Sequence, residues 1–234
     1  MKHFKIGTFI IAIASSVGCS TDMKMKVPAD IEANTQVISA TDRSMWSGAL
    51  ADETFTLGPY KITEVDRDWD SSSSTTLSFS DVDISAGELE GGYTYKITTQ
   101  NQSYQGQCAS KADKESLGIK SLSLQKKQFN LMCTCHSQDK LTSKINIQAK
   151  NLDSYLGTFN LYGQSFQIQS LKEREGMMAS GPSGYRVDSD APIGAVEVLK
   201  PGRVWLGNAL NSNEKNALTC GFVGLMLYLQ PEIK

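Results

Sequence analysis

Histidine is nearly absent from this chain of 234 residues, which has only His3 and His136. Catalysis by a histidine general base therefore has almost no raw material. The sequence also contains no G-x-S-x-G nucleophile elbow and no Walker loop, which argues against α/β-hydrolases and P-loop nucleotide-binding proteins. We therefore expect a protein that is not an enzyme and that uses no cofactor.

Basic clusters are also scarce, since no run of Lys or Arg is longer than Lys126-Lys127. The chain has 23 basic and 25 acidic residues, and loss of an N-terminal signal containing two lysines would leave a net charge of about −4. Proteins that bind nucleic acid usually present a basic face to the phosphates. We therefore expect no nucleic acid among the partners.

Apolar runs are short, and the first of them is typical of a secretory signal. Lys2, His3 and Lys5 precede the uncharged run Ile6–Ala14, which matches a basic n-region followed by an apolar h-region. The run has less than half of the roughly 20 residues that a membrane-spanning helix needs. We predict that residues 1–18 form a signal peptide.

The small residues Ser15–Gly18 then lead to Cys19. This segment resembles the lipobox of bacterial lipoproteins, although Ser16 stands where that family usually has Leu, Val or Ile. The resemblance implies that Cys19 becomes the first residue and carries acyl chains, palmitate among them, which hold the protein on a membrane. Ser20, in place of the retaining Asp, implies an outer-membrane lipoprotein that faces the periplasm or the cell surface. Cleavage after Ala14, which would release a soluble protein, stays open.

The segment from Ser20 to about Ala51 is polar and has no sustained apolar period. Such a composition is typical of a linker. We predict a lipidated N-terminus and polar tether over residues 19–51 and a single domain over residues 52–234.

Strand signals dominate this domain, as short runs in which apolar and polar residues alternate. Leu131, Cys133 and Cys135, for example, fall on one face of a predicted strand, so both cysteines are expected to point inward. The expected strands and hairpins are Thr54–Val65, Tyr93–Ile97, Phe129–Cys135, Ile145–Ala149, Leu156–Leu171 and the pair Ile193–Leu199 with Arg203–Leu206.

A helix is expected after these strands. Asn211 and Glu214 have the spacing of a capping box, and the uncharged run Ala217–Leu229 follows. A helix that is apolar on every side is buried, and thirteen residues are too few to cross a bilayer. The sequence therefore predicts a mostly β fold: an antiparallel barrel or sandwich with one buried C-terminal hydrophobic helix.

The C-terminal part resembles the tubby-like superfamily, which includes the phospholipid scramblases. The resemblance covers Tyr185–Leu229, with Ile193–Val198 and Val204–Leu206 as the last hairpin and Glu214 near the start of the helix. It implies a closed barrel around a hydrophobic helix. Membrane contact and lipid handling recur in that family, but this chain has no basic patch to support them.

Four cysteines remain beside Cys19, an even number in a compartment that permits disulfides. We predict that Cys108 bridges Cys133 or Cys135, and that Cys220 packs as a small hydrophobic residue in the buried helix.

A second interpretation gives Cys133, Cys135 and His136 a chemical role, in a thiol-redox or metal-dependent periplasmic enzyme. The spacing argues against a metal site, because zinc ligands usually have two to four residues between paired cysteines. His136 would also point to the opposite face of the strand. We therefore favour a non-enzymatic binding or structural module with no metal. Its expected partner is the membrane, through the lipid anchor, and a further protein or lipid ligand stays open.

Overall fold

A computed structural model describes residues 24–43, 53–68, 78–79, 82–83, 91–115, 126–151, 154–175 and 181–228. The predicted signal peptide, Cys19 and the last part of the apolar run lie outside the described residues. The elements are α1 (Ala29–Asn34), β1 (Thr35–Thr41), β2 (Phe55–Leu57), β3 (Tyr60–Asp68), β4 (Ser78–Phe79), β5 (Val82–Asp83), β6 (Gly91–Thr98), β7 (Ser103–Glu115), β8 (Lys126–Ser137), β9 (Lys140–Asn151), β10 (Ser154–Leu161), β11 (Gln164–Leu171), β12 (Gly184–Asp188), β13 (Pro192–Glu197), β14 (Arg203–Gly207) and α2 (Ser212–Leu227).

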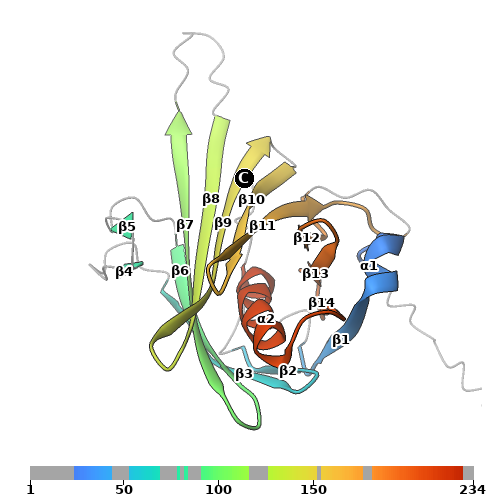
Figure 1. Cartoon of the computed structure of the whole chain (residues 1–234). Helices are drawn as coiled ribbons and strands as arrows, with labels where there is room; N and C mark the ends of the chain where they lie inside the picture. The colour runs from blue at the N-terminus through green and yellow to red at the C-terminus, as the bar shows by residue number, and fades with distance from the viewer. Residues whose placement is uncertain are drawn as a thin grey trace, which may run out of the picture.

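Twelve strands form one closed barrel, in the order β1-β14-β13-β12-β11-β10-β9-β8-β7-β6-β3-β2, with β1 and β2 hydrogen-bonded to close the ring. All neighbouring strands of the barrel are antiparallel, whereas β4 and β5 form a separate small ribbon. The prediction of a mostly β fold is confirmed, and of the two predicted architectures the barrel is the one observed. On one side, β7 to β10 extend beyond the rest of the wall (Figure 1).

Alternation along the strands decides which side chains enter the barrel. Tyr95 and Ile97 on β6, and Leu131, Cys133 and Cys135 on β8, are all buried in one interior cluster. This is the face that the sequence predicts for them. The interior of the barrel is therefore filled from the strands by large aromatic and branched side chains.

The two predicted hairpins near the C-terminal end are present. Tyr162 and Gly163 connect β10 to β11 with φ values of 47° and 85°, so both are left-handed, as a two-residue I′ turn requires. Gly202, just before β14, has a φ of 100°, a conformation that glycine adopts without the penalty of a side chain. The Lys200-Pro201 peptide beside it is cis.

The helix α2 lies inside the ring of strands (Figure 1). Its N-terminus has the predicted capping box, in which the Asn211 side chain accepts from the Glu214 backbone N–H and the Glu214 carboxylate accepts from that of Asn211. Every residue from 217 to 227 is buried. The prediction of a buried C-terminal helix is thus confirmed. No helix in the described part of the chain is both long and apolar enough to span a membrane.

The predicted tether is wrong for residues 24–43, the part of it that the structure describes. Residues 29–41, which the sequence placed between the anchor and the domain, form α1 and β1, and β1 pairs with both β14 and β2. The barrel cannot close without this strand. Because Met25 and Ile31 are also fully buried, the folded domain begins by Lys24 rather than at residue 52.

Candidate functional site

The four described cysteines form two disulfides inside the barrel. Cys108 on β7 is bonded to Cys133 on β8, one of the two pairings left open by the sequence, and the two residues are direct cross-strand neighbours. Cys135 is bonded to Cys220, which corrects the expectation that Cys220 packs as a free thiol. The helix turns Cys220 toward β8, where the inward side chain of Cys135 meets it. This second disulfide therefore joins α2 covalently to the barrel wall.

The proposed Cys133, Cys135 and His136 cluster is not assembled. The two cysteines are bonded to different partners, and both are buried, whereas His136 is half-exposed on the other face of β8. Within the described ranges, no group of three or more His, Cys, Asp or Glu side chains has an arrangement that could hold a metal ion. The geometry thus gives the enzymatic interpretation no support.

Small residues let α2 approach the wall closely. A Cβ added to Gly221 would lie 2.8 Å from the ring of Phe159, and one added to Gly224 would lie 2.8 Å from the Cys108 sulfur. Larger residues here would push the helix away from β7 to β10. The helix therefore packs directly against the wall at these two points.

Polar side chains of the wall bond to the backbone of α2. The Tyr95 hydroxyl donates to the Cys220 carbonyl at 2.9 Å, Tyr93 donates to the Gly224 carbonyl at 2.6 Å, and Ser143 donates to the Ala217 carbonyl at 2.9 Å. Burial raises the pKa of Tyr93 and of Tyr95, so both hydroxyls stay protonated and act as donors. These bonds fix the rotation of the helix inside the barrel.

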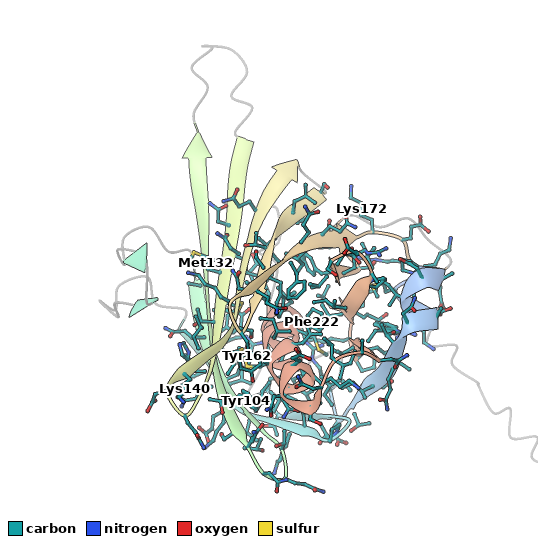
Figure 2. The ribbon with its side chains drawn as sticks, in the orientation of Figure 1. Tyr104, Met132, Lys140, Tyr162, Lys172 and Phe222 are labelled. Atoms are coloured by element: carbon teal, nitrogen blue, oxygen red, sulfur yellow. A yellow bond between two sulfur atoms is a disulfide. The ribbon has the colours of Figure 1, made fainter. Side chains whose placement is uncertain are left out.

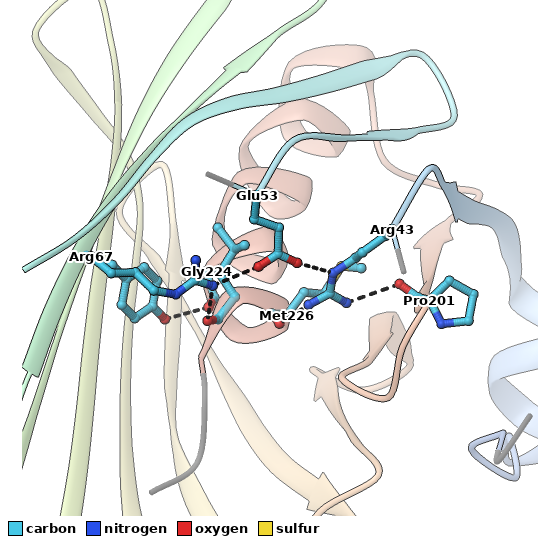
Figure 3. A network of polar contacts seen from close by, with 8 residues as sticks. Arg43, Glu53, Arg67, Pro201, Gly224 and Met226 are labelled. Carbon is cyan, nitrogen blue, oxygen red and sulfur yellow. Dashed lines mark hydrogen bonds and ion pairs between the residues drawn. The ribbon is translucent and has the colours of Figure 1, made fainter. Parts of the chain in front are cut away.

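A buried ionic triad meets the C-terminal end of α2 (Figure 3). Glu53 binds Arg43 at 2.7 Å and Arg67 at 2.8 Å. The two arginines also donate to the last helix carbonyls, Arg43 to Met226 and Arg67 to Leu227. Positive charge at a helix C-terminus is favourable because it complements the helix dipole and satisfies carbonyls that have no intrahelical partner.

The side chains of Arg43 and Glu53 are only 1% and 0% exposed, so their charges must be compensated within the protein. Burial by itself would raise the pKa of Glu53, but Arg43 and Arg67 outweigh it and hold that pKa below its usual value. Sequence reasoning missed this triad, because its members come from segments that read as polar connections or as a strand end. Its role in the structure is to cap and position α2.

The outer face of the barrel carries a groove of about 400 Å³ on β3, β6, β7 and β8. We call it the polar groove, and its polar side chains are Glu64, Thr94, Lys96, Gln105, Gln107, His136 and Asp139. Lys96 and Glu64 form an ion pair of 2.9 Å across it. Both glutamines offer amide donors and acceptors, so the groove suits a polar, hydrogen-bonding ligand better than an apolar one.

Comparison with known proteins gives no match of any kind, since no family model fits the chain and no curated protein or solved structure is significantly similar to it.

Proposed function

We propose that this protein is a lipid-anchored, non-enzymatic module of the bacterial cell envelope, attached through Cys19, that presents its barrel for binding or structural work. The observation that carries the proposal is the pairing of the cysteines. Of the five in the chain, four are joined in two disulfides. Cys19 is the one left over, and it directly follows the signal-like segment.

The two disulfides support an exported location. Such bonds form and persist in the periplasm or outside the cell, whereas cytosolic thiols are normally kept reduced. Ser20 after the anchor favours the outer membrane, with the barrel on the periplasmic side or at the cell surface. A barrel around a C-terminal helix is also the architecture implied by the tubby-like resemblance, and we retain a relationship to that superfamily as part of this proposal.

The outer surface of the barrel is the proposed binding surface. Because α2 lies inside the ring of strands, we place the ligand on the outside, where the polar groove offers a concave surface with hydrogen-bonding side chains. Its mixed charges favour a hydroxyl- or amide-rich ligand of the envelope over an anionic polymer.

Expression of the full-length chain and of Cys19→Ala in a Gram-negative host, with labelled palmitate, tests the anchor. We expect the parent to fractionate with membranes, to incorporate the label and to show an acylated Cys19 as its first residue by intact mass. Cys19→Ala should lose the label and keep both disulfides and the parental melting temperature, because residue 19 precedes the folded domain. A mature parent that begins at Ser15 without an acyl group would refute the proposal.

A further inference from the structure

The chain is fixed to the outside of the barrel immediately after the predicted anchor. The Met25 backbone N–H donates to the Glu197 carboxylate, and the Met25 carbonyl accepts from Arg203 at 3.2 Å. Arg203 in turn binds the same carboxylate at 2.8 Å. Met25 also pairs with Arg174 in an isolated β-bridge. These contacts hold Met25 at one place on the barrel.

A second apolar cluster lies beneath this segment. It consists of Met25, Ile31, Ala195 and Trp205, all buried. Ala195 and Trp205 are cross-strand partners on β13 and β14. Because their neighbours Val196 and Val204 belong to the interior cluster, Ala195 and Trp205 face outward. The outer face of this part of the barrel, which we call the covered wall, is therefore packed under α1.

Only six peptide units separate Cys19 from Met25. A fully extended chain of that length spans about 20 Å. Acyl chains on Cys19 would therefore hold the covered wall within about that distance of the lipid surface.

The polar groove lies on the far side of the barrel from the covered wall. In the ring of twelve strands, β13 and β7 are six places apart, which is half of the circumference. Strands about 4.8 Å apart and tilted as in other barrels give a backbone ring roughly 20 to 25 Å across, before side chains are added. Lys172 is two residues before Arg174, the bridge partner of Met25, and Lys140 follows Asp139 of the groove. The two lysines lie on opposite sides of the molecule in Figure 2.

We propose that the covered wall, with α1, faces the lipid surface in the anchored protein, and that the polar groove faces away from it. This inference rests on the proposed lipid attachment at Cys19. If the groove faced the bilayer, Met25 would lie more than a barrel width from the lipid surface. The six peptide units between Cys19 and Met25 cannot reach that far. The anchored barrel thus presents its groove to ligands on the side opposite the membrane.

Charge does not set this orientation. Near the covered wall, Lys26 is paired with Glu173 at 2.9 Å, and Arg186 is paired with Asp30 at 2.7 Å and with Asp188 at 2.6 Å. A wall with such mixed charge gains little from anionic lipid. The orientation should therefore be the same in neutral and anionic vesicles and at low and high salt.

The test uses lipidated Lys172→Cys and Lys140→Cys, each with a thiol-reactive fluorophore on the introduced cysteine. This pair is matched, because both lysines are exposed and both substitutions remove one positive charge. In phosphatidylcholine vesicles whose head groups carry a nitroxide quencher, we expect several-fold stronger quenching at position 172 than at 140. A linker of about 20 Gly and Ser residues between Asp22 and Met23 should remove most of this difference.

Intact mass, measured on the same preparations, separates the two ideas. If the acyl mass is present and positions 140 and 172 are quenched equally, the orientation is wrong while the lipid anchor stands. If the acyl mass is absent, the anchor is wrong and the orientation falls with it.

Discussion

Gly224 of α2 lies against Cys108 of β7 so closely that a Cβ on the glycine would stand 2.8 Å from the Cys108 sulfur. That sulfur is held in the bond to Cys133 and cannot turn aside as a free side chain would. With a glycine at this point, the backbone of the helix can lie directly against the side chains of the wall. The fit between α2 and the barrel therefore depends on the absence of a side chain.

Gly224→Ala should destabilise the protein, although alanine is usually the better helix residue by about 1 kcal/mol. Overpacking of a tight core costs about 1 to 3 kcal/mol, which exceeds that gain. Denaturant unfolding measures the net effect. Asn213→Ala, at an exposed position of the same helix, serves as the control and should stay within about 0.5 kcal/mol of the parent. A Gly224→Ala variant that is more stable than the parent would show that the helix is free to move.

The two disulfides should differ in their contribution to stability. Cys135–Cys220 closes 85 residues and Cys108–Cys133 closes 25, for which the chain-entropy model gives about 4 to 5 and about 3 to 4 kcal/mol. We expect the double variant Cys135→Ala/Cys220→Ala to lose more unfolding free energy than Cys108→Ala/Cys133→Ala. Peptide mapping without reductant should recover both bridges from the parent. Equal losses would mean that the length of the closed loop does not determine how much each bond stabilises the fold.

Glu53→Gln should be strongly destabilising at neutral pH, because it leaves Arg43 and Arg67 buried without their counter-charge. Removal of one partner from a buried ion pair costs about 3 to 5 kcal/mol. Glu64→Gln is the matched control, since Glu64 is exposed and its pair with Lys96 should contribute at most about 1 kcal/mol.

The pH dependence of the same variant follows from the lowered pKa of Glu53. A carboxyl whose pKa is lower in the folded protein than in the unfolded chain stabilises the fold fully above the unfolded value of about 4.3. This contribution is lost as the pH falls through the folded value. The stability difference between parent and Glu53→Gln, followed by thermal melts, should be constant from pH 7 to about 5 and shrink below about 4. A difference that stays constant down to pH 2 would contradict the triad.

Ile31→Ala should loosen α1 without unfolding the barrel, because Ile31 is the buried residue of this short helix and packs in the outer cluster with Trp205. The loss of such a side chain costs about 2 to 4 kcal/mol. Trypsin should then cleave faster at Lys24 and Lys26, as expected for a segment that opens locally. The control is Glu32→Ala, whose side chain is exposed. Equal cleavage rates for both variants would argue against the packing of α1 on the covered wall.

The sequence predicts much of the barrel interior, because side chains alternate along strands and α2 has no polar face. It does not predict β1, whose only buried side chain is Ala40. Nor does it predict α1, where burial rests on Ile31 alone. One buried residue in six or seven leaves no apolar face that a sequence pattern could reveal, so the N-terminal segment reads as a tether.

The polar contacts of the site could not be predicted for a different reason. Cys220 meets Cys135 only because of the rotation of α2 inside the barrel. Arg43, Glu53 and Arg67 come together only once the ring has closed. Such contacts join segments that are far apart in the sequence, so they produce no motif with a recognisable spacing.

The position of α2 in the chain order also determines when folding can finish. The strands that enclose this helix all precede it, so their inward apolar side chains have nothing to pack against until residues 212–227 are delivered. The disulfide of Cys135 likewise cannot form until Cys220 is available. A chain threaded from its N-terminus through an export channel would therefore remain unfolded until passage is almost over, and its native state would assemble in one late step on the far side.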